Sequence, residues 1–181
     1  MRIPTLLICS VLLFGCSKKT GREKLEESAI QGDARAQTEL AFMYSNGDGG
    51  PKDDAKAVEW LQKAVAQGDG AAQYDLGDKY FEGLGVPKDY KKAFALCEKA
   101  AAQGYFPAYD LLGAMYADGK GVPQDNVRAA AWFILASMNA AENELKTPAE
   151  EALGKRITAE EKIQAHDLAV KLLEKIPKGK W

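Results

Sequence analysis

The sequence is poor in the residues that carry most enzyme chemistry. Among its 181 residues there are one histidine, His166, and three cysteines. A metal site needs several converging ligands, which so few histidines and cysteines cannot supply. Asp167 directly follows His166, and adjacent side chains on a helix point about 100 degrees apart, so Asp167 cannot orient the imidazole as a catalytic carboxylate would. The sequence therefore predicts no catalytic residues, no metal and no cofactor.

The cysteines are also too few to cross-link the fold. Cys9 and Cys16 lie in or next to the N-terminal apolar segment, and only Cys97 lies further along the chain. No intramolecular disulfide is therefore expected, even in an oxidising compartment. Cys97 falls in register with Leu61 and Phe133 on an apolar stripe, which indicates a small buried hydrophobic residue.

The sequence has no excess of basic residues. It holds 24 lysines and arginines against 26 aspartates and glutamates, for a formal net charge of -2. Without a basic patch or basic residues interleaved with aromatic ones, a nucleic-acid partner is not expected. The glycine-rich stretch Gly47–Gly50 precedes no expected strand, so it is not read as a phosphate cradle, and no small-molecule substrate is expected.

The N-terminal apolar run is too short to be a stable membrane-spanning helix. It covers Ile3–Phe14, follows Arg2 and is typical of the core of a signal peptide. The residues Leu13-Phe14-Gly15-Cys16 that end it resemble the bacterial lipobox. This resemblance implies removal of residues 1–15 and attachment of lipid to Cys16.

The lipobox resemblance also implies a cellular location. Two or three acyl chains hold a protein on a membrane durably. Ser17, in the position after Cys16, implies by the lipoprotein sorting pattern an outer-membrane anchor that faces the periplasm, although Lys18 and Lys19 leave the sorting open. The alternative is an ordinary secretory signal in which Cys16 is incidental.

One pattern recurs three times in the body of the sequence. Asp33–Gly68, Asp69–Gly104 and Tyr105–Ala140 align without a gap at a fixed period of 36 residues. Self-similarity at such a period is typical of a helical solenoid. The columns that coincide are Ala36/Ala72/Ala108, Leu40/Leu76/Leu112, Tyr44/Tyr80/Tyr116, Gly47/Gly83/Gly119, Gly49/Gly85/Gly121, Pro51/Pro87/Pro123 and Asp53/Asp89/Asp125.

Each unit is predicted to be a pair of helices joined by a loop. Apolar residues recur at helical spacing on both sides of Gly-x-Gly-x-Pro-x-Asp, which itself cannot be helical. The first glycine ends one helix in the left-handed conformation, and the aspartate accepts hydrogen bonds from the free amides that begin the next. Asp33 and Asp69 begin the first two units in the same way, whereas the third unit has Pro107 near its first turn.

The repeat units are flanked by two further predicted regions. Residues 16–21 are expected to be the lipidated cysteine and a tether, and residues 22–139 the solenoid, which opens with a half-unit at Arg22–Gly32 that covers an apolar face. Residues 140–181 are expected to form capping helices.

Two capping boxes mark the helices predicted after the repeats. They are Thr147-Pro148-Ala149-Glu150 and Thr158-Ala159-Glu160-Glu161. The first opens a short helix at Ala149–Leu153, and the second a longer one at roughly Ala159–Lys175. The apolar face predicted for this last helix consists of Ile163, Val170, Leu172, Leu173 and Ile176.

The repeat unit, best seen in Asp69–Gly104, resembles the Sel-like repeat (SLR) branch of the tetratricopeptide superfamily. The resemblance covers three units and the half-unit, and it implies an all-α, right-handed solenoid of antiparallel helix pairs whose groove binds other proteins. Several secreted relatives carry a cysteine pair in each repeat, and a few of those are linked to penicillin binding or β-lactam hydrolysis. This chain has no such pairs, so we expect a binding protein and not an enzyme.

Positions that differ between units on the first helix are the candidate contacts of a partner. These columns hold aromatic and acidic side chains, a mixture that suits a binding site with a polar rim. The alternative is that some of the aromatic residues fill gaps between neighbouring helices. The candidate protein-binding residues are Arg35, Thr38, Glu39, Phe42, Tyr74, Asp75, Asp78, Phe81, Asp110 and Leu111.

Together these features predict a lipid-anchored protein of the bacterial envelope that binds another protein in its groove as a scaffold or assembly factor. One alternative is an immunity lipoprotein that neutralises a secreted antibacterial effector, which an adjacent toxin gene would favour. The other is a β-lactam-active or other cell-wall enzyme, which turnover of a chromogenic β-lactam would favour.

Overall fold

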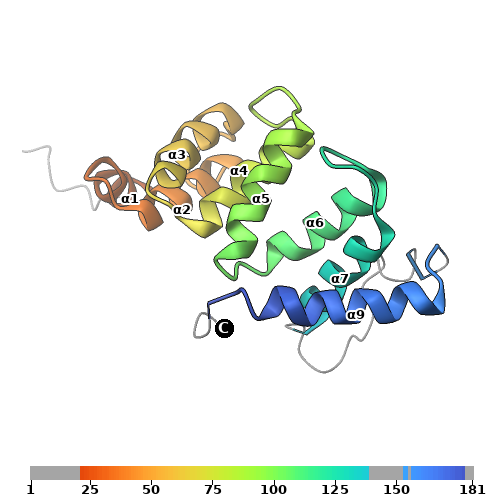
Figure 1. The fold of residues 1–181 in the computed structure, drawn as a ribbon. Helices are drawn as coiled ribbons and strands as arrows, with labels where there is room; N and C mark the ends of the chain where they lie inside the picture. The colour runs from red at the N-terminus through yellow and green to blue at the C-terminus, as the bar shows by residue number, and fades with distance from the viewer. Residues whose placement is uncertain (1–20, 139–152, 155, 178–181) are drawn as a thin grey trace, which may run out of the picture.

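The computed structural model describes residues 21–138, 153–154 and 156–177, and every described regular element is an α-helix (Figure 1). Residues 1–20, with the predicted signal peptide and Cys16, lie outside these ranges, as does the first capping box. The helices are α1 (Gly21–Ile30), α2 (Ala34–Asn46), α3 (Asp54–Ala66), α4 (Gly70–Glu82), α5 (Tyr90–Ala102), α6 (Pro107–Asp118), α7 (Asn126–Ser137) and α9 (Ala159–Leu173).

The helices pack as a succession of hairpins, each against the next. α2 pairs with α3, α4 with α5 and α6 with α7, while α3 packs on α4 and α5 on α6. At the ends, α1 packs on α2 and α9 lies along α7 (Figure 1). The core follows this order, since one buried cluster joins α1 to α4 and another joins α5, α6, α7 and α9.

The predicted hinges between the two helices of each unit are confirmed. The first glycine of each hinge is left-handed, with φ of 81°, 76° and 68° at Gly47, Gly83 and Gly119. The hinge aspartates each accept a hydrogen bond from the backbone amide three residues on, at 2.9 to 3.1 Å. α6 instead begins at Pro107 without a side-chain cap, as expected of the third unit. The capping aspartates of the hinges are Asp53, Asp89 and Asp125.

The second glycine of the hinge joins successive units. A Cβ atom added to Gly85 would overlap the backbone carbonyl of Asp54, and one added to Gly121 would overlap that of Tyr90. Both glycines also have positive φ, at 73° and 77°. The hinge of one unit therefore lies directly on the backbone at the start of the preceding unit's second helix, where only glycine fits.

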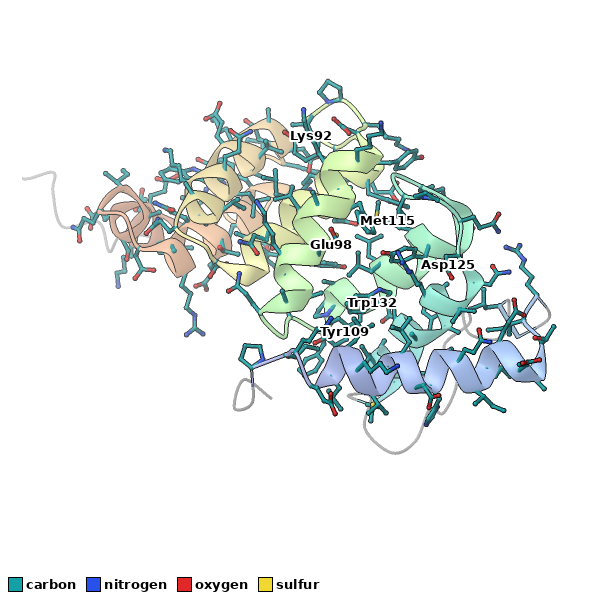
Figure 2. All side chains as sticks on the ribbon, in the orientation of Figure 1. Lys92, Glu98, Tyr109, Met115, Asp125 and Trp132 are labelled. Atoms are coloured by element: carbon teal, nitrogen blue, oxygen red, sulfur yellow. The ribbon has the colours of Figure 1, made fainter. Side chains whose placement is uncertain are left out.

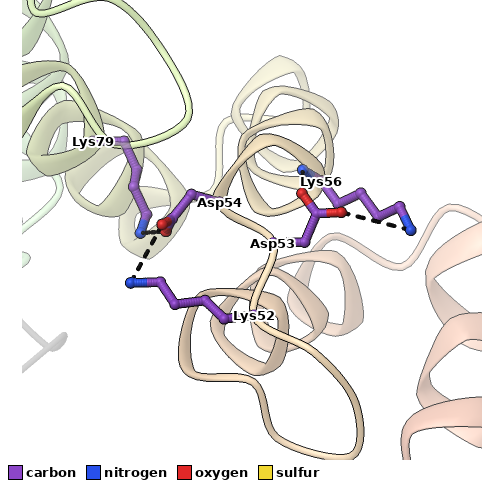
Figure 3. Close-up of polar contacts among 5 residues, drawn as sticks. All are labelled: Lys52, Asp53, Asp54, Lys56 and Lys79. Atoms are coloured by element: carbon purple, nitrogen blue, oxygen red, sulfur yellow. Dashed lines mark hydrogen bonds and ion pairs between the residues drawn. The ribbon is translucent and has the colours of Figure 1, made fainter.

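An ion pair also joins the first two units (Figure 3). Lys79 Nζ on α4 lies 2.7 Å from Asp54 Oδ1 on α3, and Lys52 Nζ lies 3.3 Å from the other carboxylate oxygen. The Lys79 and Asp54 side chains are 11% and 18% exposed. The hydrogen bond from Lys79 holds the pKa of Asp54 below its ordinary 3.8, against the opposing effect of burial. The same positions one unit later hold Tyr90 and Met115, so the next junction is apolar.

The closing helix α9 buries small side chains against α7. Its Thr158 forms the predicted capping box with Glu161. The predicted apolar face is wrong in part, because Ile163 and Val170 are 66% and 51% exposed. Close packing of two helices favours small residues between them, and the buried residues of α9 are Ala165 and Ala169. Ile176 of the predicted face is buried just beyond the end of the helix.

Aromatic rings complete the core beneath α9. Tyr109 of α6 is fully buried, and its ring centroid lies 5.5 Å from that of Trp132 of α7 (Figure 2). Phe106 packs edge-on against Tyr109 from the turn before α6. Among the described residues, no helix is both long enough and apolar enough to cross a membrane.

Candidate protein-binding surface

One face of α4 carries a continuous set of six side chains, which we call the α4 stripe. The set recurs at steps of three or four residues, so all its members lie on the same side of the helix. Most are half-buried, with Glu82 exposed at the C-terminal end. The α4 stripe consists of Ala71, Tyr74, Asp75, Asp78, Phe81 and Glu82.

At its N-terminal end the stripe borders a hollow and a second tyrosine. The ring of Tyr74 lies 5.4 Å from that of Tyr105, at an interplanar angle of 45°. A hollow of about 190 Å³ adjoins this pair and is lined by Gly70, Ala71, Gln103, Gly104 and Tyr105. The Gln103 amide is fixed there because its Nε2 donates to Gly68 O at 3.0 Å and to Gln73 Oε1 at 2.9 Å. One wall of the hollow is therefore held in place by hydrogen bonds.

At the other end, Phe81 packs against the second helix of its own unit and is approached by a lysine of the next unit. Its ring meets that of Tyr90 edge-on at 5.2 Å, and Lys120 Nζ lies 5.2 Å from its centre. Phe81 thus fits the alternative that some aromatic residues fill gaps between helices. Phe42 on α2 does not, because it is 59% exposed.

The carboxylates of the stripe are partly removed from water without gaining a cation. Burial raises the pKa of Asp75 to about 6, and Asp78 adds to the shift while Lys79 opposes it. Burial and Glu82 likewise raise the pKa of Asp78. Neither carboxylate forms a hydrogen bond or ion pair with another described residue. The Lys79 ammonium that lies on the same helix is bound to Asp54.

This arrangement costs folding stability at neutral pH. The pKa of Asp75 lies above its ordinary value of 3.8, so the folded chain binds its proton more tightly than the unfolded chain does. The free energy of unfolding therefore falls as the pH rises from about 4 to about 6, and the full cost remains above that range. Perturbed groups of this kind cluster at functional sites.

The remaining predicted contacts lie on the flanking first helices. Arg35 and Glu39 are exposed on α2. Asp110 is exposed on α6, and the partial loss of water around its carboxylate raises its pKa. Thr38 Oγ1 donates to Ala34 O at 3.0 Å and lies 3.2 Å from Asp69 Oδ1. Leu111 packs against the second core cluster and contributes to the fold.

Three residues in and around the stripe were not selected from the sequence. Tyr105 lies in the turn between units, where the other units have a capping aspartate, so its departure from the pattern was the signal. Asp69 belongs to that capping column, yet it contributes to raising the pKa of both Asp75 and Tyr105. Glu82, a member of the stripe, directly precedes the hinge glycine, and its column was not among those selected.

The arrangement is suited to noncovalent binding. Among residues 21–138, 153–154 and 156–177, no group of three or more histidine, cysteine or acidic side chains could hold a metal ion. Cys97 is fully buried, and burial raises its pKa to about 12, so it is a poor nucleophile. His166 is exposed on α9.

The stacked hairpins and the first-helix face place the protein among the α-solenoids, whose repeats form extended binding surfaces. The model of the Sel1 repeat matches residues 34–69, 70–105 and 107–140, which is more than half the chain. The chain belongs to the Sel1 repeat family, and the predicted family and all-helical solenoid are confirmed. Proteins of this family are generally protein-interaction modules and typically not enzymes.

Three solved structures resemble the chain along most of its length. The first is c5321, a protective antigen present in uropathogenic Escherichia coli strains that displays an SLR fold, with 40% identity and a TM-score of 0.77. The match covers 85% of this chain and 32% of c5321, so the chain spans about a third of that protein.

Two shorter proteins match over nearly their whole length. A Sel1 repeat protein from Oxalobacter formigenes is 37% identical with a TM-score of 0.59, over 73% of this chain and 96% of its own. Cysteine-rich protein B of Helicobacter pylori is 28% identical, with a TM-score of 0.53. The match covers 70% of this chain and 96% of that protein's chain. Comparison with curated protein sequences gives no match.

Proposed function

We propose that the protein is a binding module whose first-helix face, centred on the α4 stripe, holds another protein as a scaffold or assembly factor. The observation that carries this proposal is the pair of half-buried carboxylates, Asp75 and Asp78, which cost stability and have no cation partner among the described residues. Tyr74 and the hollow beside Tyr105 add aromatic surface, which is favoured at the centre of protein interfaces.

Site-specific photo-crosslinking in cells tests this binding face. A photo-crosslinking amino acid in place of exposed Phe42 or Asp110 is expected to capture the same partner, because both positions flank the stripe. The matched control is Glu59, an exposed residue on the second helix of the first unit. Equal capture of that partner from Glu59, or no capture from Phe42 and Asp110, would contradict the assignment of the face.

We further propose that the module is anchored by lipid on Cys16 to a bacterial envelope membrane, facing the periplasm and, from Ser17, at the outer membrane. The apolar run Ile3–Phe14 and the lipobox-like residues support this location. Replacement of Cys16 by alanine is expected to remove the lipid and release the chain from the membrane fraction. A Cys97→Ala variant, which changes a cysteine in the fold, should stay there. Continued membrane attachment of the Cys16→Ala variant would refute the anchor.

A further inference from the structure

We infer that the α4 stripe binds a basic segment of the partner protein, with an arginine or lysine side chain placed between its carboxylates and against the Tyr74–Tyr105 pair. This inference rests on the proposed function, because it specifies the chemistry of what that face binds. It requires negative charge at the stripe, an absence of competing cations among the described residues, and space for a long cationic side chain.

The negative charge at the stripe comes from carboxylates on successive turns of α4. Asp75, Asp78 and Glu82 follow each other at steps of three and four residues, and Asp69 caps the helix beside them. These groups repel one another, since Asp78 and Asp69 raise the pKa of Asp75, and Glu82 raises that of Asp78. A cation supplied by a partner would relieve this repulsion while it forms new ion pairs.

The nearby lysines are occupied elsewhere. Lys79 is bound to Asp54 at 2.7 Å, on the side of α4 that packs against α3. Lys120 pairs with Asp118 at 3.0 Å and covers the ring of Phe81. The carboxylates of Asp75 and Asp78 therefore remain available to a cation from outside the fold.

The tyrosine pair and the adjoining hollow provide a binding position for the cationic side chain. Elsewhere the chain places its own cations over aromatic rings, with Arg22 3.8 Å from the centre of Tyr44 and Lys63 3.7 Å from that of Trp60. No described cation covers the rings of Tyr74 or Tyr105 in this way. A guanidinium group can stack on such a ring and pair with a carboxylate at the same time.

A protein segment suits this surface better than the other possible occupants. The stripe rises about 17 Å along α4, at about 1.5 Å per residue, which is the length of several extended residues. Nucleic acid and anionic lipid headgroups would meet the same negative charge and be repelled. A free polyamine shares the chemistry of a basic segment but lacks a backbone and side chains to contact Phe42 and Asp110 on the flanking helices.

Peptide binding to the purified full chain tests the inference. The probe is a labelled peptide of alternating arginine and serine, with a glutamate–serine peptide of equal length for comparison, followed by fluorescence anisotropy. We expect the arginine peptide alone to bind and its affinity to fall as salt is raised. The Asp75→Asn/Asp78→Asn double variant is expected to bind it about tenfold more weakly, a loss of one or two close charge contacts.

A matched variant separates a defined site from general charge attraction. Glu59→Gln/Asp167→Asn removes the same charge from two exposed positions on α3 and α9, and it should change the affinity by less than about twofold. The Asp75→Asn/Asp78→Asn variant should melt no lower than the wild type, because it removes unfavourable charges at the stripe. The control variant should melt close to the wild type, because both of its positions are exposed. Tyr74→Leu, which keeps an apolar contact with Tyr105, should also weaken binding of the arginine peptide.

The possible outcomes decide between the inference and its alternatives. Equal losses in the two double variants, or equal binding of the glutamate peptide, would overturn the inference. Spermine binding as tightly as the peptide at the same residues would show a polyamine site and overturn the protein partner. If the peptide fails to bind while Phe42 and Asp110 still crosslink a partner, the face binds protein of other chemistry. If crosslinking fails too, the proposed function falls with it.

Discussion

Replacement of Gly85 by alanine is expected to lower the free energy of unfolding by about 3 to 4 kcal/mol, the largest effect of any substitution considered. A left-handed conformation costs alanine about 1 to 2 kcal/mol relative to glycine. The added Cβ would also overlap the backbone carbonyl of Asp54, so a main-chain segment of the preceding unit must move. Urea denaturation followed by far-UV circular dichroism measures the loss.

The control for this substitution is Gly68→Ala. Gly68 has a similar φ of 84°, but nothing lies within 4 Å of the position its Cβ would occupy. Only the conformational cost applies, so the expected loss is about 1 to 2 kcal/mol. A loss at Gly85 no greater than that at Gly68 would show that the hinge does not rest on the preceding unit.

Replacement of Lys79 by methionine is expected to lower the free energy of unfolding by about 2 kcal/mol near neutral pH. Removing one partner of a buried ion pair typically costs about 3 to 5 kcal/mol, because the other charge is left uncompensated. The cost should be smaller here, since Lys52 still lies 3.3 Å from Asp54. The measurement is the same urea denaturation, repeated across pH.

The pH dependence and a double variant check the cause of that loss. The Asp54 pKa is lowered in the folded state, so the pair's contribution is fully present above 3.8 and disappears as the pH falls through the folded pKa. The difference between the wild type and Lys79→Met should therefore be constant above about pH 4 and shrink below it. Asp54→Asn/Lys79→Met removes both charges and should recover most of the loss. A double variant as unstable as the single one would refute the role of the pair.

The sequence predicts most of the unit's internal structure because the same local physics is repeated at each hinge. A glycine in register, such as Gly47, marks a left-handed residue, and an aspartate in register, such as Asp53, marks a cap. Each of these features depends on a few neighbouring residues. Their positions could therefore be stated before the structure was known.

Contacts between units are harder to predict. Asp54 and Lys79 lie in different columns of different units, and the same two columns hold Tyr90 and Met115 at the next junction. On α9, hydrophobicity alone predicts that large residues such as Ile163 are buried. The close approach of α9 to α7 buries the small Ala165 instead. These choices depend on the distance between helices, which the local sequence does not contain.

The candidate surface could be predicted in part. Column variation identified Tyr74, Asp75 and Asp78, which the structure places on one face of α4. It missed Tyr105, because that residue lies between units and contacts Tyr74 only once the next unit is stacked. It also included Leu111, which varies between units and yet is partly buried against the core.

Gly85 packs against the main chain of Asp54, and Gly121 packs against that of Tyr90. These contacts have a consequence for how such proteins gain repeat units. The contact between a hinge glycine and a backbone carbonyl does not depend on which side chains the neighbouring unit carries. Tandem duplication of one unit would therefore preserve this main-chain contact at once, whereas a side-chain pair such as Asp54 and Lys79 would have to be established by substitution.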